Sequence, residues 1–142
     1  MPIKNYTTTV PANRSIQEIQ DALVRHGAVG VVYKYEKGTG KIEALKFGLE
    51  IKGQGVSFSL PVNWRKFEAV LKQQEVRRAN DEEYVYRVAW RCIRDWVMAQ
   101  LALYETEIVE LPQVFLPFAT GNNGKTIYEQ VTEGNLLLGE PK

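Results

Sequence analysis

Apolar residues recur at helical spacing from Asp81 to Glu107, the longest periodic stretch of the chain. At about 100° per residue they fall within an arc of roughly 180°. The residues of this arc are Val85, Val88, Ala89, Cys92, Ile93, Trp96, Val97, Ala99 and Leu103. A surface helix carries a narrower apolar stripe, so the pattern predicts a central helix over about 82–106 with other elements packed on two or more sides.

Shorter patterns precede this helix. Residues 15–26 begin with a capping-box sequence and end before a glycine, which predicts a first helix. Apolar and polar residues then alternate in three segments, 29–36, 42–52 and 56–62, separated by the glycine-bearing loops KGTGK and GQG. Short loops make neighbouring strands antiparallel, so we expect a three-stranded meander with one apolar face packed on the helices. Residues 64–78 predict a further helix.

The two ends of the chain carry weaker patterns. Residues 1–12 predict an N-terminal arm or short strand. In residues 108–142, Pro112 and Pro117 exclude a regular central strand. We therefore expect an extended, wrapping tail whose apolar residues dock individually, with a helical turn near 126–131 and a loose end.

The composition agrees with one ordinary globular domain over 1–142, of the α+β class. The chain has 142 residues, 44% of them hydrophobic and 25% charged. Cys92 is the only cysteine and His26 the only histidine, so neither a disulfide nor a cysteine- or histidine-rich metal site is predicted, and no cofactor is implied. The chain has no apolar run of about 18 residues and no secretory signal, which indicates a cytoplasmic protein with no membrane contact.

The net charge of +1 means that any binding to nucleic acid must depend on local clustering of basic residues. Arg87, Arg91 and Arg94 project within about 60° of one another on the long helix. With three neighbouring arginines they form a candidate ridge spaced to meet phosphates. The six candidate residues are Arg65, Arg77, Arg78, Arg87, Arg91 and Arg94.

The alternative is that this ridge is neutralised within the protein or simply solvated. Glu82, Glu83 and Asp95 lie close enough in sequence to pair with the arginines. The two interpretations differ in one observable property, because a binding ridge needs guanidinium groups that converge on solvent.

A second functional interpretation is protein binding through the exposed sheet or through the tail segment LPQVFLPF. Its candidate contact residues are Val114, Phe115, Leu116 and Phe118. Residues 119–126, ATGNNGKT, fit a relaxed phosphate-loop pattern, but no parallel strand or full helix is predicted around them, so a tight turn is favoured. No set of acid, base and nucleophile is evident, and only a cleft that joins His26 to a carboxylate would favour an enzyme.

Four segments together resemble a family of small uncharacterised proteins encoded by bacteriophages and prophage-like elements. They are KNYTT, SFSLPVN, AWRCIRDWVMAQLALYE and LPQVFLPF, and the resemblance covers nearly the whole chain. It implies a phage or prophage setting in the cytoplasm of a bacterial host. The order of helix, meander and long helix is also similar to double-stranded-RNA-binding domains and to the core of single-strand annealing proteins.

Two functions are therefore expected. The first is a non-catalytic accessory protein, in a ring or other homo-oligomer, that binds single- or double-stranded nucleic acid through the arginine ridge. The second is an interaction or inhibitor module that acts on a host or phage protein through the sheet or the tail.

Overall fold

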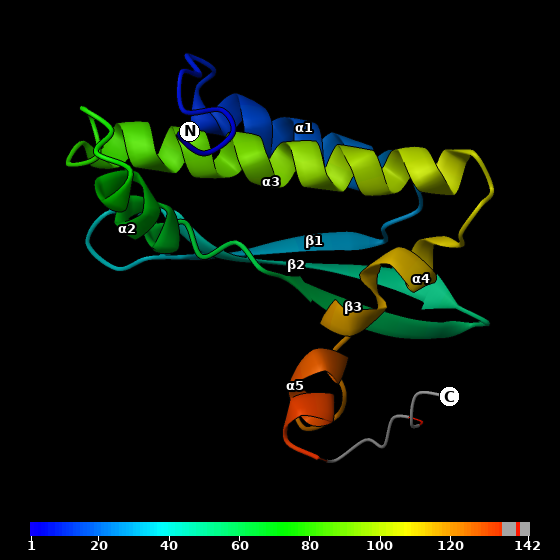
Figure 1. The fold of residues 1–142 in the computed structure, drawn as a ribbon. Coiled ribbons are helices and arrows are strands. Elements are labelled where there is room, and N and C mark those ends of the chain that lie inside the picture. The colour runs from blue at the N-terminus through cyan, green and yellow to red at the C-terminus, as the bar shows by residue number, and fades with distance from the viewer. Residues whose placement is uncertain (135–138, 140–142) are drawn as a thin grey trace.

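In the computed structural model, two helices lie side by side on one face of a three-stranded antiparallel sheet (Figure 1). The helices are α1 (Ala12–Arg25) and α3 (Glu82–Glu105). The strands β1 (Gly30–Tyr35), β2 (Ile42–Ile51) and β3 (Gln54–Leu60) are neighbours in chain order. This arrangement confirms the predicted α+β meander packed on the first helix and the long central helix.

Alternation along β2 determines which face of the sheet is buried. Leu45, Phe47 and Leu49 are buried beneath the helices, whereas Lys46 points to the opposite face. Phe47 pairs in register with Phe58 of β3, and their rings stack with centroids 5.1 Å apart. A slip of one residue would exchange the two faces and expose the apolar side chains, so the register is strongly determined.

The long helix begins where its sequence provides a cap. The carboxylate of Asp81 accepts a hydrogen bond from the backbone N–H of Glu83 at 3.0 Å, which satisfies one of the free amides of the first turn. Five of the nine residues of the predicted apolar arc are buried, but Ala99 and Leu103 are exposed, Leu103 to 44%. Leu103 lies in the last turn of α3, which extends past the end of α1 (Figure 1).

The first helix starts earlier than predicted. It begins at Ala12, directly after Pro11, and the expected cap Ser15 is fully buried inside the helix. Instead of capping the helix, the hydroxyl of Ser15 accepts a hydrogen bond from Arg91 at 3.3 Å. The preceding residues form turns and lie along α3 as an arm, where Tyr84 donates its hydroxyl hydrogen to the carbonyl of Tyr6.

The second helix is shorter than predicted. The helix α2 (Arg65–Gln73) ends before Glu75, whose φ of 58° lies in the left-handed region. A continuous helix from α2 into α3 is therefore absent, and a connection with turns leads to Asp81.

The tail is more helical than predicted: the helical turn expected near residues 126–131 is present, but residues 111–118 are helical rather than extended. It forms α4 (Leu111–Phe115), η1 (Leu116–Phe118) and α5 (Ile127–Thr132). Pro112 and Pro117 each occupy one of the first two helical positions, where the missing N–H would have no helical partner. Both prolines therefore start helical turns as well as preventing a strand.

The tail passes the edge of β3 and reaches the side of the sheet opposite α1 and α3 (Figure 1). Ala119 forms an isolated antiparallel bridge with Phe58 at this edge. The structure describes residues 1–134 and 139, so the predicted loose end lies largely outside the described residues. No helix in the described part is long and apolar enough to cross a membrane.

Candidate functional site: the outer sheet face and the terminal cleft

The arginine row of α3 lies mainly in the interface with α1. Arg91 Nη1 is 2.9 Å from Glu18 Oε2, and Arg94 Nε is 2.9 Å from the same oxygen. Burial raises the pKa of Glu18, but the hydrogen bonds and positive charges of Arg91 and Arg94 outweigh burial and hold this pKa below its usual value. The shared carboxylate therefore joins the two helices by a network of ion pairs.

The remaining member of the row has a different partner within the chain. Arg87 donates from Nε to the backbone carbonyl of Thr8 at 3.1 Å, and its guanidinium lies 5.6 Å from the ring centroid of Tyr84. Since Tyr84 itself bonds the carbonyl of Tyr6, both side chains hold the N-terminal arm against α3. The three guanidinium groups of the row thus have intramolecular acceptors.

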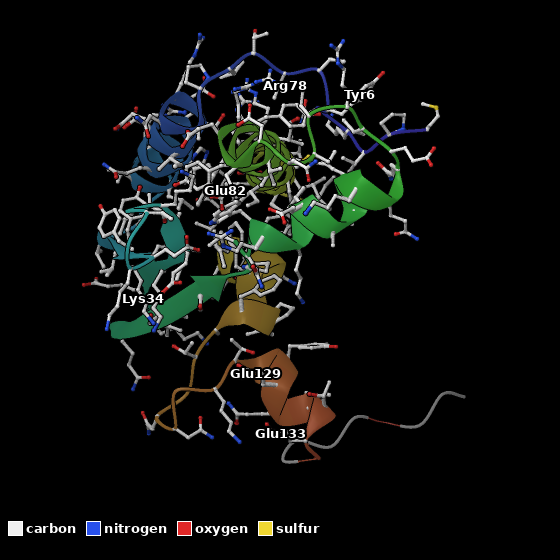
Figure 2. All side chains as sticks on the ribbon, turned by 90° about the vertical axis from the view of Figure 1, so that its left-hand side faces the viewer. Tyr6, Lys34, Arg78, Glu82, Glu129 and Glu133 are labelled. Atoms are coloured by element: carbon white, nitrogen blue, oxygen red, sulfur yellow. The ribbon has the colours of Figure 1, made fainter. Side chains whose placement is uncertain are left out.

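The other candidate arginines are spread around α2 and the connection to α3. Arg65 is bonded to Glu36 at 2.6 Å and to Glu82 at 2.5 Å. Arg78 is 2.7 Å from Asp81. Figure 2 shows Arg78 beside the N-terminal Tyr6 near α3, far from Lys34 on the sheet. Among the described residues, Arg77 is the only one of the six candidate arginines with neither an ion pair nor a hydrogen bond from its side chain.

The ion pair between Arg65 and Glu36 predicts a low pKa for the carboxyl group of Glu36. Hydrogen bonds from Arg65 and Thr39 lower the pKa of Glu36 to about 2. Because this folded-state value lies below the ordinary value of 4.5, the pair stabilises the fold above about pH 4.5, and the stabilisation is lost as the pH falls towards 2. An NMR titration of the side-chain carboxyl should give this value, and Arg65→Gln should return it towards 4.5. A wild-type value near 4.5 would show that the pair does not form in solution.

The tail segment is largely part of the core. Phe115 is fully buried, with its ring centroid 5.3 Å from that of Phe47 and 5.9 Å from that of Trp96. Val114 is half-buried, and Phe118 packs on Trp96 with centroids 5.6 Å apart. Leu116 alone of the four candidate contact residues is exposed, at 51%. A partner would find a single apolar side chain here rather than a continuous strip.

On the face of the sheet opposite α1 and α3, which we call the outer sheet face, side chains of β1 are exposed in the described part of the chain. Val32 of β1 is 64% exposed and pairs in register with Lys46 of β2. Two adjoining hollows of about 310 Å³ and about 140 Å³ lie over this pair. Their lining residues are Val29, Gly30, Val32, Lys34, Ala44, Lys46, Phe47, Gly48 and Ser57.

The sequence indicated the exposed sheet as a possible contact surface but assigned no residues to it, because alternation marked this face only as polar. The available signal was the presence of small and apolar residues at outward positions, namely Val32, Ala44 and Gly48. These positions lie together on the neighbouring strands β1 and β2, so their small and apolar surface is contiguous rather than scattered.

A third hollow, which we call the terminal cleft, lies where the ends of α1, α3 and β2 meet the start of α4. Its volume is about 510 Å³. The residues around it are His26, Gly27, Val29, Leu49, Glu50, Tyr104, Glu110, Leu111 and Pro112. Val29 is 67% exposed and lines both this cleft and the outer sheet face, so the two form one continuous surface.

The terminal cleft brings His26 next to a carboxylate, the arrangement that would favour an enzyme. His26 Nε2 is 2.8 Å from Glu105 Oε1, and Nδ1 is 2.6 Å from the carbonyl oxygen of Ala22. Both ring nitrogens thus lie within hydrogen-bond distance of acceptor oxygens of the same chain. Of the residues lining the cleft, only Tyr104 carries a hydroxyl, and in the described part of the chain no three metal-binding side chains come together.

The phosphate-loop-like sequence forms a closed turn. The amide of Gly124 donates to the carbonyl of Gly121 at 3.0 Å, and the amide of Gly121 donates to Lys125 at 2.9 Å. Thr126 then caps the short helix α5. The amides of Gly121, Gly124 and Lys125 are therefore already bonded to acceptors inside the loop.

Comparison with protein-family models, curated proteins and solved structures found no match.

Proposed function

We propose that this protein is a non-catalytic interaction module that binds another protein through the outer sheet face. The observation that carries this proposal is the exposure of Val29 and Val32, at 67% and 64%, on an open strand surface. Protein interfaces combine an apolar centre with a polar rim, and Lys34 and Lys46 supply such a rim here. The biological setting we propose, a phage or prophage acting on a host or phage protein, follows from the resemblance of the four segments.

Binding to nucleic acid through the arginine ridge has less support. Five of the six candidate arginines donate to acceptors of the same chain, so a phosphate would have to compete with these internal partners or use the remaining N–H groups. The ridge remains a prediction that solution binding can test. Fluorescence anisotropy at low and moderate salt would support it if binding weakened steeply with salt and also fell in Arg77→Ala.

Position-specific crosslinking tests the proposed protein partner. With a photoreactive benzoylphenylalanine in place of Val32, we expect a discrete crosslinked species in host cells. The same group in place of Lys72, an exposed residue of α2, should give none. Val32→Glu should weaken binding to the identified partner at least tenfold, or about 1.4 kcal/mol, with unchanged thermal stability. Equal crosslinking at both positions, or no effect of Val32→Glu, would contradict the proposal.

A further inference from the structure

We propose that the terminal cleft binds a lysine or arginine side chain flanked by apolar residues, within a segment of the protein partner. This inference rests on the proposed function and assigns part of the partner's chemistry. The cleft has the size and mixed lining typical of a specific binding site, with an apolar floor and a few polar groups at its margin. Leu49 and Leu111 are buried below it, and Val29 is exposed beside it.

The charges around the cleft favour a cation. Glu50 and Glu110 both line it, and Glu105 adjoins it through His26. Of the described residues that line the cleft, His26 alone can carry a positive charge, and its ring is already bonded to Glu105. Two carboxylates of the lining therefore lack a cationic partner within the cleft.

These two carboxylates differ in how they are held. Glu110 is fixed in a capping box at the start of α4, where its side chain accepts the backbone N–H of Gln113. Glu50 is exposed on β2, and its side chain forms no hydrogen bond or ion pair with any described residue. Glu50 is thus the carboxylate best placed to pair with an incoming ammonium or guanidinium group.

The floor explains why the cation should have apolar neighbours. Lysine and arginine cover apolar surface with their methylene stems while the charged end reaches polar groups. The ring of Tyr104, which lines the cleft and is 37% exposed, offers a further face for a cation. An anionic ligand would meet carboxylates here, so this part of the surface disfavours phosphate. Across Val29, a bound segment would continue onto the outer sheet face.

The test uses the full chain and three acetylated, amidated pentapeptides. Their sequences are Leu-Lys-Leu-Lys-Leu, Leu-Gln-Leu-Gln-Leu and Leu-Glu-Leu-Glu-Leu. In two-dimensional NMR titrations we expect the lysine peptide to shift the amide signals of His26, Gly27, Leu49 and Tyr104 and to reach saturation. The glutamine peptide should bind at least fivefold more weakly, and the glutamate peptide should cause no saturable shift.

Charge variants assign the effect to the cleft. Glu50→Gln should weaken binding of the lysine peptide at least threefold, and Glu50→Lys should abolish the preference for lysine over glutamate. Glu75→Gln is the matched control, because Glu75 is an exposed carboxylate in the connection after α2. Equal binding of the lysine and glutamate peptides, or equal effects of Glu50→Gln and Glu75→Gln, would overturn the inference.

The outcomes separate this inference from the proposed function. Crosslinking at position 32 without a charge preference in the cleft would leave the interaction module standing and reject its basic ligand. A charge preference without crosslinking at position 32 would keep the ligand site and reject the outer sheet face as the main contact.

Discussion

Replacing Phe115 with alanine is expected to lower the free energy of unfolding by about 3–5 kcal/mol. The side chain is fully buried, and its ring meets those of Phe47 and Trp96 edge to face. These neighbours are fixed by β2 and α3, so they have little freedom to move into the vacated space. Urea denaturation followed by tryptophan fluorescence and circular dichroism measures the change.

Leu116→Ala provides the control within the same tail. Leu116 is 51% exposed, so its loss should change the free energy of unfolding by less than about 1 kcal/mol. Similar small changes in both variants would mean that the tail is not packed in solution. In that case Phe115 would again be a candidate contact for a partner.

Replacing Glu18 with alanine is expected to cost about 1.5–3 kcal/mol of folding stability. The substitution leaves Arg91 and Arg94, whose side chains are 18% and 28% exposed, without their shared carboxylate. Removing one partner of a partly buried ion pair costs more than the median surface pair, because the remaining charge stays poorly solvated. Glu18→Gln keeps the shape and one acceptor, so its effect should be about half as large. Chemical denaturation at two salt concentrations gives these values.

The pH dependence of this network has a definite sign. The pKa of Glu18 is lowered in the folded state, so the contribution of its charge is present above the ordinary value of 4.5 and is lost as the pH falls through the lower folded value. Glu68→Ala is the control, since Glu68 pairs at 3.0 Å with Lys72, which is 50% exposed, on α2 alone. Its expected cost is below about 1 kcal/mol. A Glu18→Ala variant no less stable than Glu68→Ala would show that the network does not support the fold.

Glu18→Gln also separates the two functional interpretations. If the arginine row binds nucleic acid, weakening its internal partner should increase the affinity for nucleic acid at low salt. If the row joins α1 to α3, the main effect should be on stability.

The sequence was sufficient for those features that depend on local periodicity. Alternation around Leu45 and Phe47 predicted a strand, and the apolar arc from Val85 onward predicted the central helix, because each pattern repeats within a few residues. The secondary structure of the tail was harder to predict, since Pro112 is compatible both with an irregular segment and with the first turn of a helix.

The candidate site was harder to predict from the sequence, because its residues lie far apart along the chain. Glu18 lies 73 residues from Arg91, and spacing along α3 gave no indication of that pair. The terminal cleft likewise joins His26 to Glu110 through the packing of four elements.

Three acidic residues were expected to neutralise the arginine ridge. Glu82 and Asp95 pair with its arginines, whereas Glu83 pairs with Lys41 instead.

The bridge between Phe58 and Ala119 makes the two margins of the sheet unequal. Thr120 donates its backbone N–H at 2.8 Å and its hydroxyl at 3.1 Å to the carbonyl of Ser57, so the chain itself occupies part of the β3 margin. β1 is the other outer strand of the sheet. Two copies of the chain paired through their β1 strands would leave only the two β3 margins, and the tail occupies part of each. Assembly would therefore stop at the dimer, and growth into a fibre would first require the tail to detach from Ser57.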